Sequence, residues 1–441
     1  MPSTLIRNAT VVTMNDRFDV LAAAVSVRDG RIVSIGDEPA DPHDVAIDAG
    51  GAYLLPGFVQ THIHLCQTLF RGYADDLRLL DWLRTRIWPM EAAHTPASLR
   101  AAARLACHEL LCSGTTTILT METVHDTDAV FEAVAETGIR ATIGKCMMDA
   151  DAPGVPSRLR EETRRSIDES VALRRAWDGA ANGRLRAAFA PRFAISCTRG
   201  LLEEVAALSL QQLALVHTHA SEQRDEVELI RSMHGSSNVE YLAQVGLLTS
   251  RLNVAHCVWV EPHEQHMLAA HDAKVTHCPG SNLKLGSGVA PVADMLALGI
   301  CVSLGSDGAA CNNRLDMFGE MRLAATLQAM RQEPGVLPAR EAVRMATVNG
   351  ARALGLETEI GSVELGKRAD LILIGRDSAA VAPDPDPYST IVYAAGPSDV
   401  RLTMVDGELL VRDGSAMRLD AAAVAADARR EAHMLAARAS L

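Results

Sequence analysis

The sequence predicts an α/β protein in which a (β/α)8 TIM-type barrel is joined to a small composite β-sandwich domain built from both chain ends. Between residues 57 and 352, eight short apolar runs alternate with stretches of helical spacing, as in a barrel of buried parallel strands. Before and after this region, the chain reads as short strands separated by turns. Polar residues follow the barrel runs, at the strand ends where barrel enzymes place their chemistry.

The first 56 residues are expected to form short strands. Strand-like runs occupy 5–14, 24–28 and 31–35, and Asp29-Gly30 between the last two is a hairpin signal. Nothing in this stretch points to catalysis. It is predicted to be one half of the composite domain.

The barrel should begin just after Pro56-Gly57. The predicted strands are 57–62, 114–120, 138–146, 185–191, 213–219, 252–257, 273–277 and 300–306. Helical spacing between them is clear at 96–112 and 199–209. An open doubly wound sheet is the alternative architecture, but no Gly-x-Gly-x-x-Gly follows an early strand.

After about residue 352 the sequence again has the pattern of short strands. Runs at 361–374 and 402–411 read as strands, and the Ala- and Arg-rich stretch 420–439 reads as a terminal helix. The predicted domains are therefore residues 1–56 with 353–418 as the composite β domain, 57–352 as the barrel, and 419–441 as a C-terminal helix.

Composition narrows the class of protein. The 441 residues are 48% hydrophobic and 22% charged, which is typical of a globular protein with a sizeable core. A net charge of −13 argues against nucleic acid or an anionic membrane as partner. Nine cysteines without a Cys-x-x-Cys pair, and no signal-peptide pattern or long apolar run, predict a cytoplasmic protein.

A metal site is predicted at the strand ends. His62 and His64 are one residue apart, so both point to the same side of a strand. His219, His256 and Asp307 end later runs, and three imidazoles with a carboxylate suit Zn²⁺ or Fe²⁺. Each of these residues alone has a structural alternative, such as a buried histidine bonded to backbone.

Glu222 is the candidate proton carrier because it stands three residues beyond His219. Its alternative role is that of a solvated glutamate at a helix start. No lysine ends the fourth predicted strand, where a carbamylated lysine would have to stand to bridge two metals. One divalent metal ion is therefore expected.

In this order, the motifs Pro-Gly-Phe-Val-x-Thr-His-x-His, His-Thr-His-Ala-Ser-Glu, Val-Ala-His-Cys-Val, Ser-Asn-Leu-Lys-Leu-Gly-Ser-Gly and Leu-Gly-Ser-Asp-Gly-Ala span the barrel. Together they resemble the amidohydrolase superfamily over essentially the whole chain. Within it, the sequence is similar to the branch of methylthioadenosine/S-adenosylhomocysteine deaminases, 5′-deoxyadenosine deaminases and s-triazine hydrolases.

The resemblance implies a role for each matching residue. His62, His64, His219 and Asp307 would bind the metal, Zn²⁺ before Fe²⁺. His256 would orient the attacking hydroxide, and Glu222 would protonate the ring nitrogen beside the attacked carbon. Glu91 would accept hydrogen bonds from ribose hydroxyls, and Lys145 and Arg158 would lie around the 5′ substituent. Glu91 has an alternative role as a carboxylate on a helix face, and Lys145 and Arg158 have one as solvated surface charges.

Two residues are compatible with more than one base in the substrate. Arg192 stands where the methylthioadenosine branch carries a purine-contacting histidine, and Pro191-Arg192-Phe193 is similar to guanine deaminases. A guanidinium offers donors only, which suits an oxygen or acceptor nitrogen of a purine. Trp88 can stack on a ring, although a packing role fits it equally well.

The predicted function is hydrolytic deamination of an aminopurine nucleoside, a 5′-modified adenosine first, giving the inosine analogue and ammonia. A guanine, pterin or s-triazine amino- or chlorohydrolase is the enzymatic alternative, and a non-catalytic scaffold is the remaining one. The expected partner is a small N-heterocyclic substrate, in a homo-oligomer that contacts neither nucleic acid nor membrane.

Overall fold

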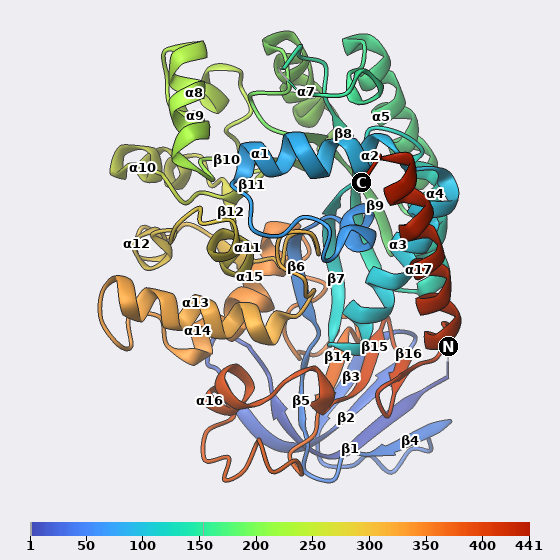
Figure 1. The fold of residues 1–441 in the computed structure, drawn as a ribbon. Coiled ribbons are helices and arrows are strands. Elements are labelled where there is room, and N and C mark those ends of the chain that lie inside the picture. The colour runs from blue at the N-terminus through green and yellow to red at the C-terminus, as the bar shows by residue number, and fades with distance from the viewer. Residues whose placement is uncertain (1, 153) are drawn as a thin grey trace.

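The structure is a computed structural model that describes residues 2–152 and 154–441. Figure 1 shows a barrel with its surrounding helices in the upper part of the view and a separate mixed sheet below it. The lower sheet combines strands from the two chain ends, coloured blue and red. The predicted architecture, a barrel plus a composite β domain, is therefore confirmed.

The barrel contains eight parallel strands that pair in chain order. They are β6 (Phe58–Ile63), β7 (Thr115–Met121), β8 (Arg140–Met147), β9 (Leu185–Pro191), β10 (Val216–Ala220), β11 (Leu252–His256), β12 (Lys274–His277) and β13 (Val302–Leu304). Each of them overlaps one of the eight predicted runs. All residues of β7 and β8 are buried, because helices cover the outside and side chains fill the inside.

Helices connect the barrel strands. The longer ones are α3 (Pro96–Cys112), α4 (Thr127–Thr137), α5 (Thr163–Trp177), α7 (Arg199–Gln212), α8 (Arg224–His234), α10 (Pro262–Ala270), α13 (Met317–Arg331) and α14 (Ala339–Ala346). The shorter ones are α6 (Ala180–Gly183), α9 (Asn238–Gln244), α11 (Pro279–Lys284), α12 (Val292–Ala297) and α15 (Val348–Ala353). α3 and α7 occupy the two stretches where helical spacing was clear.

The ring closes where β6 meets β13. Thr61 Oγ1 lies 2.7 Å from Ser303 Oγ inside the barrel, and the backbone N–H of Asp307 donates to the carbonyl of His62 at 3.1 Å. A Cβ at Gly305 would collide with the backbone of His62, so glycine permits this close approach. Closure therefore brings the loop after β13 against the end of β6.

The composite sheet has nine strands, in the order β17-β16-β15-β14-β5-β1-β2-β3 with β4 beside β1. Their bounds are β1 (Thr4–Val12), β2 (Val20–Arg28), β3 (Arg31–Gly36), β4 (Val45–Asp48), β5 (Tyr53–Pro56), β14 (Leu371–Ile374), β15 (Val400–Val405), β16 (Glu408–Arg412) and β17 (Ser415–Ala416). β2 and β3 form the hairpin predicted at Asp29-Gly30. β5 ends at Pro56 and β6 begins at Phe58, so the chain passes directly from the composite sheet into the barrel there.

The strand prediction was wrong for 361–370, which contains no strand. Gly361 and Gly366 have φ values of 92° and 84°, so the chain turns there, and its amides bond individually to the sheet edge. β4 and β5 were not predicted, because each has four residues and little alternation.

Both faces of β14, in the middle of the composite sheet, are buried. Leu371 and Leu373 of β14 pack into the core of this domain, while Ile372 and Ile374 pack into the large core shared with the barrel. The period of two residues in a strand explains this division. The apolar run 371–374 thus serves two cores at once.

A helical segment crosses the barrel region in blue in Figure 1. It consists of α1 (Leu79–Trp82), a π-helical stretch (Leu83–Ile87) and α2 (Trp88–Ala92). A 3₁₀ helix (Leu65–Phe70) precedes it directly after β6. Single π-helical turns are frequent at functional sites.

The remaining helices lie outside the barrel strands. They are α16 (Pro387–Ser389), the π-helical Thr390–Ala394, the 3₁₀ helices Ser157–Leu159 and Pro397–Asp399, and α17 (Ala421–Arg438). α17 runs beside α3, in red in Figure 1. In the part of the chain that the structure describes, no helix combines the length and the apolar character needed to cross a bilayer.

Candidate metal centre and the cavity around it

The strand ends bring four predicted ligands to one point. His62 Nε2 lies 3.2 Å and His64 Nε2 3.3 Å from the same oxygen, Oδ1 of Asp307. His219 Nε2, from β10, lies 3.3 Å from His64 Nε2. These residues come from β6, β10 and the loop after β13, so the barrel itself assembles the cluster.

Each histidine of the cluster uses its Nδ1 in a hydrogen bond, which leaves its Nε2 facing the shared point. The Nδ1 partners are His217 Nε2 for His62 (2.7 Å), Met121 O for His64 (2.8 Å), Arg192 O for His219 (2.7 Å) and Asn282 Oδ1 for His256 (2.9 Å). Such bonds fix the ring orientation and tautomer of metal-binding histidines. The rings are thus already oriented as ligands.

The donor set fits a divalent ion. Among the described residues, Nε2 of His62 is buried and has no hydrogen-bond partner, which is costly unless something else binds it. Burial lowers the pKa of His62 to about 4 and that of His219 well below its usual value, so both imidazoles are neutral. Burial would raise the pKa of Asp307, but His62 and His64 outweigh it and keep the carboxyl ionised. Neutral imidazoles and a carboxylate are what Zn²⁺ or Fe²⁺ requires.

The backbone is strained at two of these residues. His256 and Asp307 have φ values of 75° and 60°, in the left-handed region that residues other than glycine rarely adopt. Asp307 is held there by Ser281 Oγ, which donates to Oδ2 at 2.7 Å, and by the N–H of Gly308, which donates to Oδ1 at 2.7 Å. Strain of this kind concentrates at functional sites.

His256 differs from the other three histidines. Its Nε2 lies 3.6 Å from Glu222 Oε2 and 3.9 Å from Asp307 Oδ2. Burial alone would lower the pKa of His256, but the carboxylates of Glu222 and Asp307 outweigh it and raise it. This imidazole therefore stands between two carboxyl groups and can hold a proton.

Glu222 is buried beside the cluster, in the loop after β10. Burial raises the pKa of its carboxyl to about 7, and Oε1 has no partner among the described residues. Its backbone N–H donates to Glu226 Oε2 at 2.7 Å, which fixes the loop. The arrangement offers a carboxyl group that carries a proton near neutral pH.

These residues line one cavity. Its walls are His64, Gln67, Leu79, Trp82, Leu83, Arg192, Phe193, His219, Glu222, His256 and Asp307. The predicted aromatic residue, Trp88, is absent from this lining and is 2% exposed in the hydrophobic core. Trp82, one and a half turns earlier on the same helical segment, faces the cavity instead, and its Nε1 has no partner in the described part of the chain.

Glu91 and Arg192 bind each other. Arg192 Nη1 lies 2.5 Å from Glu91 Oε2, and Nη2 lies 3.2 Å from Oε1, in a buried bidentate pair. Gln67 Nε2 donates to Glu91 Oε1 at 3.0 Å. Arg192 and Gln67 line the cavity, and Glu91 lies directly behind them.

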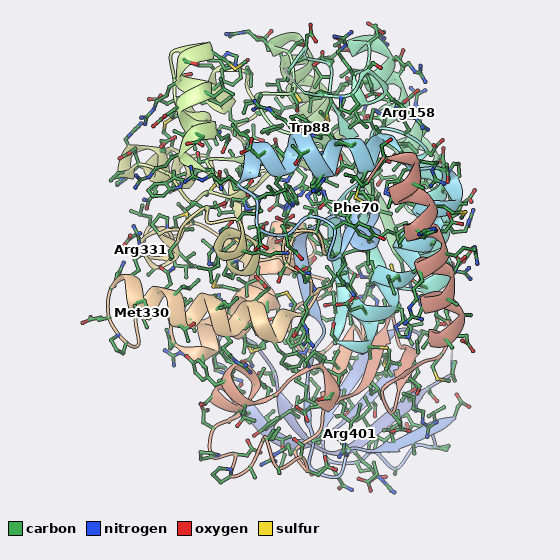
Figure 2. All side chains as sticks on the ribbon, in the orientation of Figure 1. Phe70, Trp88, Arg158, Met330, Arg331 and Arg401 are labelled. Atoms are coloured by element: carbon green, nitrogen blue, oxygen red, sulfur yellow. The ribbon has the colours of Figure 1, made fainter. Side chains whose placement is uncertain are left out.

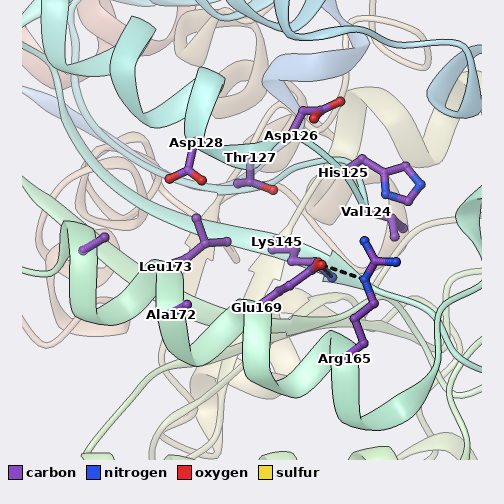
Figure 3. A pocket seen from close by; sticks show the side chains of 11 residues that line it. Val124, His125, Asp126, Thr127, Asp128, Lys145, Arg165, Glu169, Ala172 and Leu173 are labelled. Atoms are coloured by element: carbon purple, nitrogen blue, oxygen red, sulfur yellow. Dashed lines mark hydrogen bonds and ion pairs between the residues drawn. The ribbon is translucent and has the colours of Figure 1, made fainter.

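Lys145 is not brought to the cavity. It faces the outside of the barrel, where Nζ donates to Glu161 at 2.6 and 2.7 Å, and it lines a separate pocket between α4 and α5 (Figure 3). The alternation of β8 explains this, because the next residue, Cys146, lies against Arg192 and so faces inward. The dashed line in Figure 3 joins Arg165 to Glu169 in the same outer pocket.

Arg158 lies on the loop after β8, near the helical segment that carries Trp88 (Figure 2). Its Nη2 donates to the carbonyl of His94 at 3.2 Å, just beyond the end of α2. The side chain is exposed and does not line the cavity.

Several residues of the site were not predicted. His217 orients His62, and Gln67, Trp82 and Phe193 line the cavity. His217 had a signal, because it alternates with His219 on one strand. Leu79, Trp82 and Leu83 also had one, since their i, i+3, i+4 spacing forms one helical face. Gln67 had none.

The comparisons with known proteins agree with this geometry. The model of the amidohydrolase family matches residues 53–410. A Methanosarcina mazei protein named 5′-deoxyadenosine deaminase is 39% identical over 440 residues, covering 99% of each chain. A Pelotomaculum thermopropionicum protein named 5-methylthioadenosine/S-adenosylhomocysteine deaminase is 37% identical, covering 98% of each chain.

A solved structure is similar over the same length. It is described as an adenosine deaminase from Xanthomonas campestris with bound zinc, and it is 32% identical with a TM-score of 0.90. The match covers 98% of each chain, so both the barrel and the composite β domain are included.

Proposed function

The chain belongs to the amidohydrolase family, and on that premise we propose that it is a metal-dependent hydrolytic deaminase of aminopurine nucleosides. The first substrates to consider are 5′-deoxyadenosine, methylthioadenosine and S-adenosylhomocysteine, which the names of the relatives contain. The observation that carries the proposal is the buried carboxyl of Glu222 beside His256 and Asp307, at the edge of the ligand cluster.

Four residues would hold the metal: His62, His64, His219 and Asp307. A bound divalent ion supplies Lewis acidity, which lowers the pKa of water from about 16 to about 7. The zinc in the Xanthomonas structure supports Zn²⁺ as the ion, and the same ligands accept Fe²⁺. Removing the metal with a chelator should abolish activity, and separate reconstitution with each ion should show which restores it.

The chain's own groups then handle the protons. In the reaction a water oxygen bonds to C6 of the purine, the bond from C6 to the amino group breaks, and ammonia leaves. Asp307, an ionised carboxylate, accepts a proton that the water loses, and His256 orients the water between the two carboxyl groups. Glu222, whose pKa is raised to about 7, donates its proton to the ring nitrogen beside C6.

The cavity walls would bind the nucleoside. Trp82 lines the cavity, so its ring could stack on the base. We propose that Glu91 takes the sugar hydroxyls and that Arg158 lies nearest the 5′ substituent. Trp88 supports the segment from the core, and Lys145 stands outside the cavity.

A substrate panel tests the proposal. Metal-reconstituted protein should release ammonia from 5′-deoxyadenosine, methylthioadenosine or S-adenosylhomocysteine faster than from guanine, a pterin or an s-triazine. Turnover of guanine alone would overturn the nucleoside assignment. A protein that binds no metal and turns over none of these compounds would be a non-catalytic scaffold instead.

We also propose a cytoplasmic homo-oligomer. The nine cysteines are all free and eight are buried, which suits a reducing compartment. Cell fractionation tests the location, and light scattering tests the oligomeric state.

A further inference from the structure

Arg192 and Glu91 form a closed unit with Gln67 rather than two separate substrate contacts. The two side chains of the ion pair are 5% and 1% exposed. Buried bidentate pairs between arginine and carboxylate are strongly directional, because two parallel N–H groups fix the carboxylate plane. The orientation of Glu91 is therefore set by Arg192.

Gln67 completes the unit from the other side. Since Glu91 Oε1 can only accept, the amide of Gln67 must present Nε2 to it, which leaves Gln67 Oε1 as a buried acceptor without a partner among the described residues. A Cβ at Gly308 would collide with that oxygen, so the amide is packed in place. An unpaired buried acceptor needs a partner, and a hydroxyl of a bound ligand is one that a residue lining the cavity can meet.

The backbone of Arg192 is fixed as firmly as its side chain. Its carbonyl accepts from His219 Nδ1 at 2.7 Å and from Thr218 Oγ1 at 3.2 Å, and its N–H donates to Met147 O at 3.2 Å. One residue thus connects a histidine of the metal cluster with the carboxylate of Glu91. The position of Glu91 relative to the metal cluster follows from this connection.

We propose that Arg192 is a positioning residue. It holds Glu91 in the orientation that binds the sugar hydroxyls of the nucleoside, and it does not itself contact an oxygen of the base. Glu91 occupies the side of the guanidinium where Nη1 and Nη2 donate in parallel, so this pair of donors is not free for a purine carbonyl. Two acceptors remain for two neighbouring hydroxyls: the second lone pair of Glu91 Oε2 and the free Oε1 of Gln67. The inference rests on the proposed function, because it specifies the sugar end of that substrate.

A substrate-and-variant cycle tests the proposal. The kcat/KM values of wild type and Arg192→Lys are measured with 5′-deoxyadenosine and with 2′,5′-dideoxyadenosine, which lacks one hydroxyl. Wild type should lose about tenfold to a hundredfold on removal of the hydroxyl, as expected for a hydrogen bond to a charged group. In Arg192→Lys this loss should shrink to within about twofold, mainly through a raised KM for the hydroxylated substrate.

Direct contact between Arg192 and the base predicts a different pattern of kcat/KM values. If Arg192 contacts the base, Arg192→Lys lowers kcat/KM by the same factor for both substrates, and the loss on hydroxyl removal stays as in wild type. That outcome overturns the proposal. Arg186→Lys, an exposed arginine on the same strand β9, is the matched control and should behave as wild type.

Separate measurements show whether each variant folds. Metal content and the thermal midpoint of each variant show whether the site is intact. If Arg192→Lys does not fold, Gln67→Met replaces it: this variant removes one acceptor and keeps the ion pair, so about half of the logarithmic loss should remain. Wild type inactive on every nucleoside would refute the proposed function, whereas an active wild type with unchanged discrimination in Gln67→Met or Arg192→Lys would refute this inference alone.

Discussion

Glu222 occupies an environment that keeps a carboxylic acid protonated near neutral pH. It is 5% exposed, its pKa is raised to about 7 by burial, and its nearest charged neighbour is His256 at 3.6 Å. Asp307, a few ångströms away, stays ionised because His62 and His64 outweigh its burial. Two carboxyl groups with separated pKa values are the usual sign of an acid and a base in one site.

The change Glu222→Gln removes the transferable proton and keeps the shape of the side chain. Turnover should fall about 100-fold to 10,000-fold, the range typical of losing a general acid. Metal content, measured by elemental analysis, should stay as in wild type because Glu222 lies outside the predicted ligand set. Retained turnover, or loss of the metal, would contradict the assigned role.

His94 gives the fold a predictable dependence on pH. Burial lowers its pKa from 6.5 to about 3, partly offset by its bond to the carbonyl of Cys66. Below pH 6.5 the unfolded chain takes up a proton that the folded chain cannot, so stability falls as pH drops toward 3 and is unaffected above 6.5.

Between pH of about 6.5 and about 5, this histidine alone should cost about 2 kcal/mol of unfolding free energy. Urea unfolding of the metal-loaded protein at several pH values measures the slope. In His94→Gln, the unfolding free energy should change less steeply with pH, by the amount that corresponds to the uptake of about one proton. Equal slopes in variant and wild type would show that His94 becomes protonated without penalty.

The sequence predicted that four histidines and Asp307 gather at the strand ends, whereas five residues of the cavity lining were not predicted: Gln67, Leu79, Trp82, Leu83 and Phe193. His62, His64, His219, His256 and Asp307 follow predicted strands, and parallel strands of a barrel all end on one rim. The bonds that orient the rings depend on packing between distant strands, which spacing does not encode. The sequence therefore predicted which residues meet but not how they are held.

At the scale of elements, the helical segment after β6 shows that a sequence motif does not predict which of its side chains face the cavity. Trp88 and Trp82 are six residues apart, and a straight α-helix would place them about 120° apart around its axis. The π-helical stretch Leu83–Ile87 shifts the register between them. A π-helical turn leaves no clear trace in hydrophobic spacing, so the sequence did not indicate that Trp82 lines the cavity while Trp88 packs in the core.

Gln60 shows how one side chain holds two elements together. Its Nε2 donates to Thr115 Oγ1 and Leu315 O, both at 3.1 Å, and its Oε1 accepts from Ser306 N at 3.1 Å and from Ser306 Oγ at 2.7 Å. The amide is fully satisfied. It ties β6 and β7 to the loop that ends at Asp307.

Gln60→Met should therefore destabilise the barrel by about 2–4 kcal/mol, because it leaves the buried backbone N–H of Ser306 and the carbonyl of Leu315 unpaired. It should also weaken metal binding, since Ser306 adjoins Asp307. Urea unfolding and competition with a metal-binding dye measure the two effects. Gln211→Met, at an exposed glutamine, is the control and should change neither.

At the scale of the whole molecule, buried charges join the composite sheet to the barrel. Arg140, at the start of β8, binds Asp370 at 2.8 and 3.0 Å and Asp406 at 2.9 Å. Arg184, just before β9, binds Asp406 at 3.3 Å. Both aspartates follow the barrel in the sequence and lie more than 200 residues from the arginines that they bind, so no local pattern could predict the network.

Asp370→Asn leaves Arg140 buried with its charge incompletely paired. The unfolding free energy should fall by about 3–5 kcal/mol, the range for breaking a buried pair from one side. Asp377→Asn removes a surface partner of Arg401 in the same domain and should cost less than about 1 kcal/mol. Equal losses would mean that the buried network does not couple the two domains.

The two domains also show why the outline of the fold was predictable. Strand runs and helical spacing follow from the burial of each element, so the apolar end of the predicted run 361–374 contains β14, at 371–374. The segment 361–370 reads like a strand, but its glycines turn the chain and its amides bond outside any ladder. Which short strands join the sheet is decided by partners far away in the sequence, as for β4 and β5.

The central claim is that the protein replaces the amino group of a purine nucleoside with an oxygen from water. The most direct measurement is mass spectrometry of the product formed from 5′-deoxyadenosine by the metal-loaded protein in water enriched with heavy oxygen. The inosine analogue should carry the heavy oxygen and appear in equal amount with ammonia. Unchanged nucleoside, or a product that keeps its amino group, would contradict the claim.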